Sequence, residues 1–392
     1  MILLTETKPT LPSDWYYDTG HYQRELHAIW YRDWVCVGRA EEIPSAGDYI
    51  VANIGDQSLI IVRSGDDAIR AFHNTCRHRG SVICTKDSGR FRNGRIICPY
   101  HTWTYSLDGD LIATPHRVDT EDFQPSDYPL YDVHVGQWGG FIFVNLSDEP
   151  DKSLQDFLGA EAAGLANWPL KDLVSVQREI SALKCNWKVF WENFSECYHC
   201  PRHHPELCKV IPMYKEGLMS SYEPEGDERV PDDLQLGMGE GKVTWTMDGQ
   251  TSLPFFDGLS AEDIEEGMVY ASFTASMWVV GHPDYVRSVR IYPTGPETTD
   301  LVVDWYLMPG TREKYGDEIN HMLELGRLVV EQDAELSDLN QLGLKSKAHK
   351  QGVLVPQEYA VWDFHEWLRS RLAISSQRHG LRPLAEQAEV QP

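Results

Sequence analysis

The sequence predicts an α+β protein in which a small, mainly β domain precedes a larger domain made of an antiparallel sheet with helices packed on it. The first part of this prediction comes from short strand-like runs that are interrupted by Gly, Asp and Ser about every eight residues. This spacing is typical of small antiparallel structure. The runs lie at 49–51, 58–63, 68–73, 95–97, 102–106 and 140–145.

The second part comes from helical and strand patterns that alternate later in the chain. Four aromatic residues at i, i+3, i+4 and i+7 indicate an amphipathic helix from Asn186 to about Cys200. A long amphipathic helix is also expected from about Tyr315 to Leu339. Between these helices lie strand-like runs at 269–280, 285–292 and 300–308.

These patterns divide the chain of 392 residues into segments. We expect a helical lead-in, a compact β domain, an α+β domain and a frayed tail. Long Gly-rich and acidic loops are expected at 220–268. The predicted boundaries are 1–35, 36–150, 151–384 and 385–392.

Composition restricts the possible functions. The chain has 60 acidic and 35 basic residues, a net charge of −25, so a nucleic-acid surface or an anionic-membrane anchor is not expected. No apolar run is long enough to cross a bilayer, and the first residues lack the pattern of a secretory signal. Eight cysteines in a chain of this length are too few for a secreted disulfide scaffold. We therefore expect a cytoplasmic protein whose Cys and His clusters bind metal.

The first such cluster contains Cys76, His78, Cys98 and His101. Each half pairs a thiol with an imidazole in a loop between expected strands. Two thiolates and two imidazoles can hold a structural zinc ion, and they can equally hold a [2Fe–2S] cluster with thiolates on one iron and imidazoles on the other. The spacing alone does not decide between the two.

The second cluster spans Glu192 to Cys208 and contains three histidines and three cysteines. A zinc site from Cys197, Cys200 and His203 or His204 is one interpretation. The alternative is non-haem Fe(II) held by two histidines and one carboxylate, with positions left open for oxygen and substrate. The best carboxylate is Asp333, because its expected helix turns it toward the core, where a carboxylate needs a cation or hydrogen bonds. Glu331 and Glu335 fall on other faces.

Both clusters resemble the motifs of Rieske non-haem iron oxygenases. The segments CRHRG and CPYHTWTYSLDG are similar to the Rieske iron–sulfur signature, and Glu196-Cys-Tyr-His199-(x4)-His204-Pro is similar to the ferrous-iron motif. The resemblance covers about residues 25–370. It implies a Rieske [2Fe–2S] domain followed by a catalytic domain with the helix-grip fold, in which a curved antiparallel sheet grips a long helix.

The resemblance also implies roles for individual residues. Cys76, His78, Cys98 and His101 would hold the cluster, and His199, His204 and Asp333 would hold the mononuclear Fe(II). Glu196 would connect a Rieske histidine of one subunit with an iron histidine of another in a homotrimer. Asn193 would lie close to the iron.

The implied reaction is the use of O2 to hydroxylate a small molecule. No dinucleotide-binding signature is present, so electrons would come from a separate ferredoxin or flavin reductase fed by NAD(P)H. Glu at position 196 resembles the branch that acts on carnitine, choline and betaines, and predicts oxidative N-demethylation of a quaternary ammonium compound. Tyr270, Phe273 and Trp278 are the expected pocket walls. The alternatives are a ring-hydroxylating oxygenase for an aromatic acid and, more remotely, a zinc-binding structural protein.

Overall fold

The chain forms two compact units in the computed structural model, which describes residues 3–219, 229 and 234–378. One unit contains residues 30–158, and the other combines residues 1–29 with the chain from 159 onward. The boundaries given above remain a sequence-based prediction. The expected tail at 385–392 and most of 220–233 lie outside the described residues.

The first unit is mainly β, as the sequence predicts. Its seven-stranded sheet has the order β2-β11-β10-β5-β4-β3-β6, and a three-stranded sheet has the order β7-β8-β9. Strands β2, β6, β9 and β10 were not expected. The bounds are β2 Val35–Arg39, β3 Asp48–Ile54, β4 Gln57–Arg63, β5 Ile69–His73, β6 Ser88–Arg90, β7 Arg95–Ile97, β8 Thr104–Ser106, β9 Leu111–Ala113, β10 Asp132–Trp138 and β11 Phe141–Asn145.

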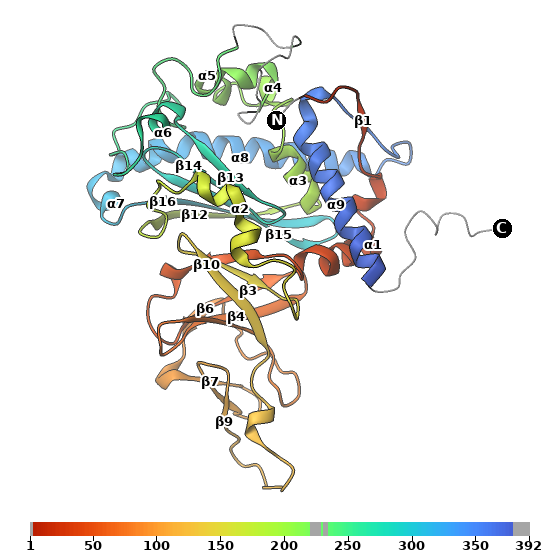
Figure 1. The fold of residues 1–392 in the computed structure, drawn as a ribbon, viewed down its shortest axis with the longest axis vertical. Helices are drawn as coiled ribbons and strands as arrows, with labels where there is room; N and C mark the ends of the chain where they lie inside the picture. Colours follow the sequence, from red (N-terminus) through yellow and green to blue (C-terminus); the bar gives the residue numbers. More distant parts are fainter. Residues whose placement is uncertain (1–2, 220–228, 230–233, 379–392) are drawn as a thin grey trace, which may run out of the picture. The chain divides into compact units, whose positions relative to one another are not determined.

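The second unit is built on a five-stranded antiparallel sheet with the order β12-β16-β15-β14-β13. The long helix α8 runs along this sheet (Figure 1). The bounds are β1 Lys8–Pro9, α1 Thr19–Glu25, β12 Val174–Leu183, α3 Trp187–Phe194, α4 Cys200–His203, α5 Leu207–Val210, α6 Ala261–Glu266, β13 Val269–Phe273, β14 Met277–Gly281, β15 Val286–Gly295, β16 Thr298–Leu307, α7 Thr311–Lys314, α8 Gly316–Leu344, β17 Val353–Leu354 and α9 Tyr359–Arg378. The boundary between the two units falls within helix α2, Leu154–Gly164.

Two expected elements differ in the structure. The strand expected at 269–280 is a hairpin of β13 and β14, closed by the Ser276 N–H donating to the Phe273 carbonyl at 3.0 Å, and no Gly or Pro marks this turn. The helix expected to reach Cys200 ends at Phe194. The Ser195 hydroxyl bonds the Trp191 carbonyl at 2.7 Å, and Pro201 cannot donate the N–H that a continuous helix needs. Residues 195–199 therefore form a loop.

A buried ion pair joins the N-terminal segment to α3. The Lys188 ammonium lies 2.7 Å from the Glu25 carboxylate, and neither side chain is exposed. Glu25 also accepts from the Trp187 indole at 2.9 Å, and Lys188 donates to the Trp15 carbonyl at 2.9 Å. Burial acts to raise the pKa of Glu25, but Lys188 and His21 outweigh it and lower that pKa. The pair thus fixes the start of the helix that leads into the second Cys/His cluster.

Prediction for the buried pair: Lys188→Met should destabilise the protein strongly, because it leaves the Glu25 carboxylate buried without its cation. The expected cost is about 3–5 kcal/mol, read as a fall in the thermal unfolding midpoint. The double variant Glu25→Gln/Lys188→Met should recover most of this loss, since the amide still accepts from Trp187. Equal stability of the single variant and wild type would contradict the argument.

Candidate metal centres

The first Cys/His cluster lies on two neighbouring loops of the β unit. Cys76 and His78 follow β5, and Cys98 and His101 connect β7 to β8. Both loops are tight turns: the Gly80 N–H donates to the Cys76 carbonyl at 3.0 Å, and the Thr102 N–H donates to the Cys98 carbonyl at 3.1 Å. The structure therefore brings all four predicted residues together from two segments.

The four side chains divide into buried thiols and more exposed imidazoles. Cys76 and Cys98 are buried in the core, where the Tyr105 hydroxyl lies 3.3 Å from the Cys76 sulfur. The two imidazoles face each other through the same ring atom, with the Nδ1 atoms 3.2 Å apart. Burial raises the pKa of Cys76 and lowers the pKa of His78. A thiol pair on the inside and an imidazole pair on the outside fit a Rieske [2Fe–2S] cluster.

Cys84 lies near this cluster but does not belong to it. It is buried, and burial raises the pKa of its thiol to about 12. Its backbone N–H and carbonyl both bond the Asn74 side chain, at 2.8 Å each. Its surroundings are those of a structural core cysteine, which agrees with the sequence-based interpretation.

The second cluster is formed by the loop after α3 and by helix α8. His199 lies at the end of the loop, His204 directly follows α4, and Asp333 points inward from the middle of α8. Asp333 shares its buried face with Val329 and Ser337, one turn away on either side. Glu331 and Glu335 are exposed. The helical-face argument thus selected the buried carboxylate.

Three donor atoms converge at this point. His204 Nε2 lies 2.9 Å from Asp333 Oδ1, His199 Nε2 lies 3.4 Å from the same oxygen, and the two Nε2 atoms are 3.1 Å apart. Ligand atoms at right angles, each ~2.1 Å from one ion, lie ~3.0 Å from one another. The donors therefore fit three adjacent corners of an octahedron, the two-His-one-carboxylate arrangement of non-haem Fe(II) sites.

Electrostatics favour a cation here. Burial acts to raise the pKa of Asp333, but the hydrogen bonds with His199 and His204 hold it at about 2. Burial acts to lower the pKa of His199, but Asp333, Cys200 and Glu196 together raise it to about 12. Negative charge is thus concentrated where the three donors meet, and a divalent ion would neutralise it.

Further partners orient each ligand. Glu196 Oε1 lies 2.5 Å from His199 Nδ1, and Gln332 Oε1 lies 2.6 Å from His204 Nδ1. Each oxygen accepts the Nδ1 proton, so the Nε2 lone pairs are free for a metal. Asn193 Nδ2 donates to Asp333 Oδ1 at 2.7 Å. Glu196 lies in the loop and not on a helix as expected; its other oxygen accepts from the Tyr198 and His199 N–H groups.

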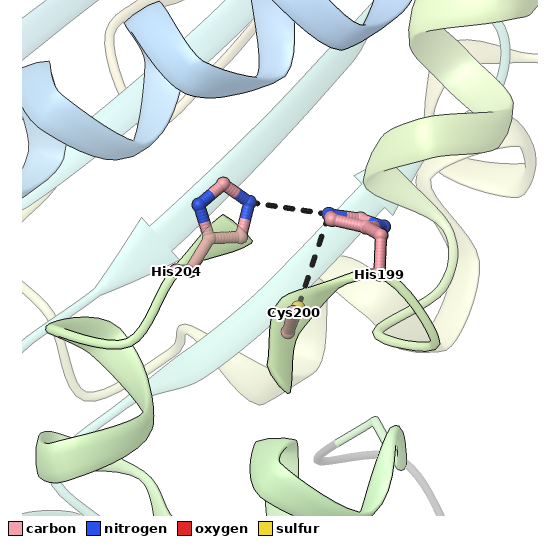
Figure 2. Close-up of side chains that lie close together, drawn as sticks. All are labelled: His199, Cys200 and His204. Atoms are coloured by element: carbon pink, nitrogen blue, oxygen red, sulfur yellow. Dashed lines mark hydrogen bonds between the residues drawn. The ribbon is translucent and has the colours of Figure 1, made fainter. Parts of the chain in front are cut away.

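A competing set of ligands includes a thiol. His199, Cys200 and His204 have donor atoms within 4.8 Å of one another, and Figure 2 shows the Cys200 sulfur pointing toward the His199 ring. This sulfur is 3.9 Å from His199 Nε2. The neighbouring Cys197 thiol and burial raise the pKa of Cys200 far above that of a free thiol, so it stays protonated. A protonated thiol is a poor metal ligand, and Asp333 is the better third donor.

A cavity of about 450 Å³ opens beside the three donors. Tyr270 and Trp278 line it, as expected from the sequence, and so do Asn193 and Glu196. Phe273 does not, which corrects the sequence-based expectation. Side chains alternate along β13, so Phe273 is buried on the opposite face from Tyr270 and Ser272.

Sequence reasoning missed two groups of residues at this site. Gln332 gave no signal, because a lone glutamine beside an aspartate is not a motif. Helix α9 supplies Ala360, Asp363, Phe364 and Trp367 to the cavity wall. Their spacing of i, i+3, i+4 and i+7 is a helical stripe that could have been found in the sequence.

Two family descriptions match the chain. Residues 33–124 match the Rieske [2Fe-2S] domain, and residues 166–374 match the ring hydroxylating alpha subunit (catalytic domain). The second match covers more than half of the 392 residues. The chain therefore belongs to the Rieske non-haem iron oxygenases, enzymes with a [2Fe–2S] cluster and a mononuclear iron in each such chain.

Curated relatives agree with this family. The glycine betaine monooxygenase oxygenase subunit of Chromohalobacter salexigens is 32% identical over 382 residues, which is 91% of this chain and 84% of the relative. The carnitine monooxygenase oxygenase subunit of Acinetobacter baumannii is 28% identical over 346 residues, 87% of this chain and 86% of the relative. The solved structure of a quaternary ammonium Rieske monooxygenase with L-carnitine has a TM-score of 0.71 at 23% identity, covering 93% of this chain and 96% of that one, and shows the same fold.

Prediction for the carboxylate ligand: Asp333→Ala should lower the mononuclear iron content and the activity while leaving the visible spectrum of the cluster intact, because two imidazoles alone hold ferrous iron weakly. Iron and acid-labile sulfide are measured together on the purified protein. Glu331→Ala, two residues away and exposed, is the matched control and should keep its iron. Loss of iron from Glu331→Ala but not from Asp333→Ala would show that the ligand was chosen wrongly.

Proposed function

We propose that this oxygenase oxidises an N-methyl group of a small quaternary ammonium compound and releases formaldehyde. The observation that carries this proposal is the lining of the cavity beside the iron donors. Aromatic and acidic residues make up half of the residues that line it. Both attract a quaternary ammonium group, which cannot donate an N–H hydrogen bond.

The aromatic part of the wall is a connected cluster. Trp278 stacks on Trp191 with ring centroids 4.0 Å apart, and Phe194 lies 4.4 Å from Trp278. The other rings that line the cavity are Tyr214, Trp245, Tyr270, Phe364 and Trp367. Each ring face that a trimethylammonium group contacts contributes about 0.5–2 kcal/mol.

The charged part of the wall is acidic. Glu161, Glu196, Asp333 and Asp363 all line the cavity, and no Lys or Arg does so among the residues that the structure describes. A purely apolar pocket would suit the alternative of ring hydroxylation, but carboxylates around the cavity favour a cationic group next to the iron. The similarity to glycine betaine, carnitine and choline monooxygenases supports the same choice.

The proposed reaction is hydroxylation of an N-methyl group followed by loss of formaldehyde. One atom of O2 is inserted into a C–H bond of the methyl group, and the other is reduced to water by two electrons and two protons. The resulting N-hydroxymethyl ammonium loses formaldehyde and a proton as its C–N bond breaks, which leaves a tertiary amine. Bound at these sites, the cluster would store electrons and the mononuclear iron would activate oxygen. Asn193 and Gln332 hold the iron ligands in place.

The source of the electrons is also part of the proposal. A separate ferredoxin or flavin reductase would supply them, and the more exposed His78 and His101 edge suits their entry. We propose a homotrimer in which Glu196 joins His199 of one chain to a Rieske histidine of the next. No helix in the described part of the chain is long and apolar enough to cross a membrane, and none of the eight cysteines, all described, forms a disulfide. The free thiols suit the reducing cytoplasm, which we propose as the location of the protein.

Prediction for the reaction: with a surrogate reductase, NADH and O2, the enzyme should release formaldehyde from at least one trimethylammonium compound. Glycine betaine, carnitine and choline are the first candidates, with an aromatic acid such as benzoate as the competing class. Formaldehyde and the demethylated amine should form in a one-to-one ratio. Hydroxylation of benzoate without any formaldehyde from the ammonium compounds would contradict the proposal.

Prediction for Glu196: Glu196→Gln should keep both metal sites filled, since neither loses a ligand, but should slow product formation. The neutral amide weakens the charge-assisted bond to His199, which is worth about 1.5–3 kcal/mol, so a loss of at least 10-fold is expected. In a single turnover, the visible spectrum of the reduced protein should persist after O2 and substrate are added. Reoxidation at the wild-type rate would mean that Glu196 only closes the loop.

A further inference from the structure

Strand β15 carries two buried arginines with opposite surroundings. Arg290 lies 2.6 Å from the Asp304 carboxylate and is thereby neutralised. Arg287 is 1% exposed, and none of its three guanidinium nitrogens has an acceptor among the described residues. An unpaired buried charge is costly, so its presence calls for an acceptor that the described residues do not supply.

A second donor without a partner lies beside Arg287. The Trp305 indole N–H on β16 is fully buried and also has no acceptor in the described part of the chain. Both groups face the same glycine of α8: a Cβ at Gly326 would lie 3.2 Å from Arg287 Nη1 and 3.4 Å from Trp305 Nε1. A glycine within a helix costs about 1 kcal/mol, and here it lets the backbone of α8 pack directly against the two donors. Donors without acceptors define a place for an anion.

The sheet register puts this pair on the same face of the sheet as residues that line the substrate cavity. Tyr270, Val280, Arg287 and Trp305 form one row across four strands. The next row on the same face begins with Ser272 and Trp278, and Tyr270, Ser272 and Trp278 all line the cavity. The Arg287 guanidinium lies 5.1 Å from the ring of Trp245, which lines the cavity as well. Trp245 is thus the only described ring found both over Arg287 and in the cavity wall.

Helix α8 sets the distance between this pair and the iron site. Gly326 contacts Arg287, Val329 lines the cavity, and Asp333 is the iron ligand. Seven residues separate the first from the last, which is about 10 Å along the helix axis. One small zwitterion can therefore place its methyl groups near the iron and its opposite end near Arg287.

We propose that Arg287 and Trp305 form a carboxylate subsite next to the cavity, beside Trp245, so that the substrate is an N-methylated amino acid zwitterion and not a cationic alcohol. This inference rests on the proposed function and names its substrate class. The acidic and aromatic wall next to the iron takes the ammonium group. The guanidinium and the indole N–H bind the carboxylate. The Trp245 ring, which lies beside Arg287 and lines the cavity, turns aside when the substrate binds.

Three titratable groups of the described chain lie in the electric field of Arg287, and none of them is an anion that compensates its charge. Burial, and then Arg287, lower the pKa of His282 well below that of a free imidazole. Tyr270 and Tyr285, also within its field, are buried phenols whose pKa values are raised by that burial. All three neighbours are therefore neutral. None of these three neighbours carries a negative charge, so a substrate carboxylate could pair with Arg287.

The test compares a carboxylate with an alcohol that has the same ammonium group. Glycine betaine, carnitine and choline are titrated anaerobically into the reduced holoenzyme by calorimetry. Wild type should bind at least one of the two carboxylates at least 10-fold more tightly than choline. Arg287→Met should weaken binding of that carboxylate by about 10- to 100-fold, the effect expected for a charge-assisted bond, and change choline by less than about 3-fold. Trp305→Phe should show a smaller loss with the same selectivity.

The matched control is Arg327→Met, which removes a half-buried guanidinium of α8 that pairs with Glu179 at 2.5 Å. It should bind every compound like wild type. The proposal is wrong if wild type prefers choline, if Arg287→Met leaves carboxylate binding unchanged, or if it weakens all compounds alike. Arg287→Met should fold at least as well as wild type, because replacing an unpaired buried charge by an apolar group relieves its cost.

An acetate titration separates this proposal from the proposed function. Acetate at constant ionic strength should raise the thermal midpoint of wild type and not that of Arg287→Met, and chloride should do so more weakly. If wild type binds none of the three ammonium compounds, the proposed function fails, while the acetate difference still supports an anion subsite. An equal response of both proteins to acetate would overturn the subsite.

Discussion

The catalytic half of this protein depends on one buried carboxylate. Asp333 lies inside the core, where an ionised group is stable only with a cation or with strong donors. The imidazoles of His199 and His204 provide those donors from a loop more than a hundred residues away in sequence. The requirement that these three groups meet fixes the position of α8 against α3 and the loop after it. It also explains why Asn193 is hydrogen-bonded to Asp333 and Gln332 to His204.

The two metal centres use burial in opposite ways. In the Rieske domain the thiols are buried and the imidazoles reach toward solvent, so charge is shielded on one side and electrons can enter at the other. In the catalytic domain His204 and Asp333 are buried, yet the donors border a cavity lined by aromatic rings and carboxylates. The first arrangement suits electron transfer, and the second suits a substrate that must be held close to the metal with little water around it.

Much of the fold and the convergence of seven candidate ligands could be predicted, because short motifs carry the Cys and His pairs and a helical face carries Asp333. The missing parts had weaker signals. In strand β12, Arg178 interrupts the apolar alternation of Val174, Val176 and Ile180. The turn between β13 and β14 contains no Gly or Pro. Phe273 was placed on the wrong face because, without a recognisable turn, the sequence did not show which side chains of β13 point toward the cavity. The Arg287 and Trp305 pair depends on contacts between β15, β16 and α8, which no local pattern records.

The central claim is that Asp333, and not Cys200, completes the iron site with His199 and His204. A crystal structure of the iron-loaded protein, with an anomalous difference map measured above the iron edge, tests this most directly. We expect a peak separate from the cluster, about 2.0–2.2 Å from His199 Nε2, His204 Nε2 and a carboxylate oxygen of Asp333. A metal ion bonded to the Cys200 sulfur, at about 2.3 Å, with the Asp333 carboxylate turned away from it, would contradict the account.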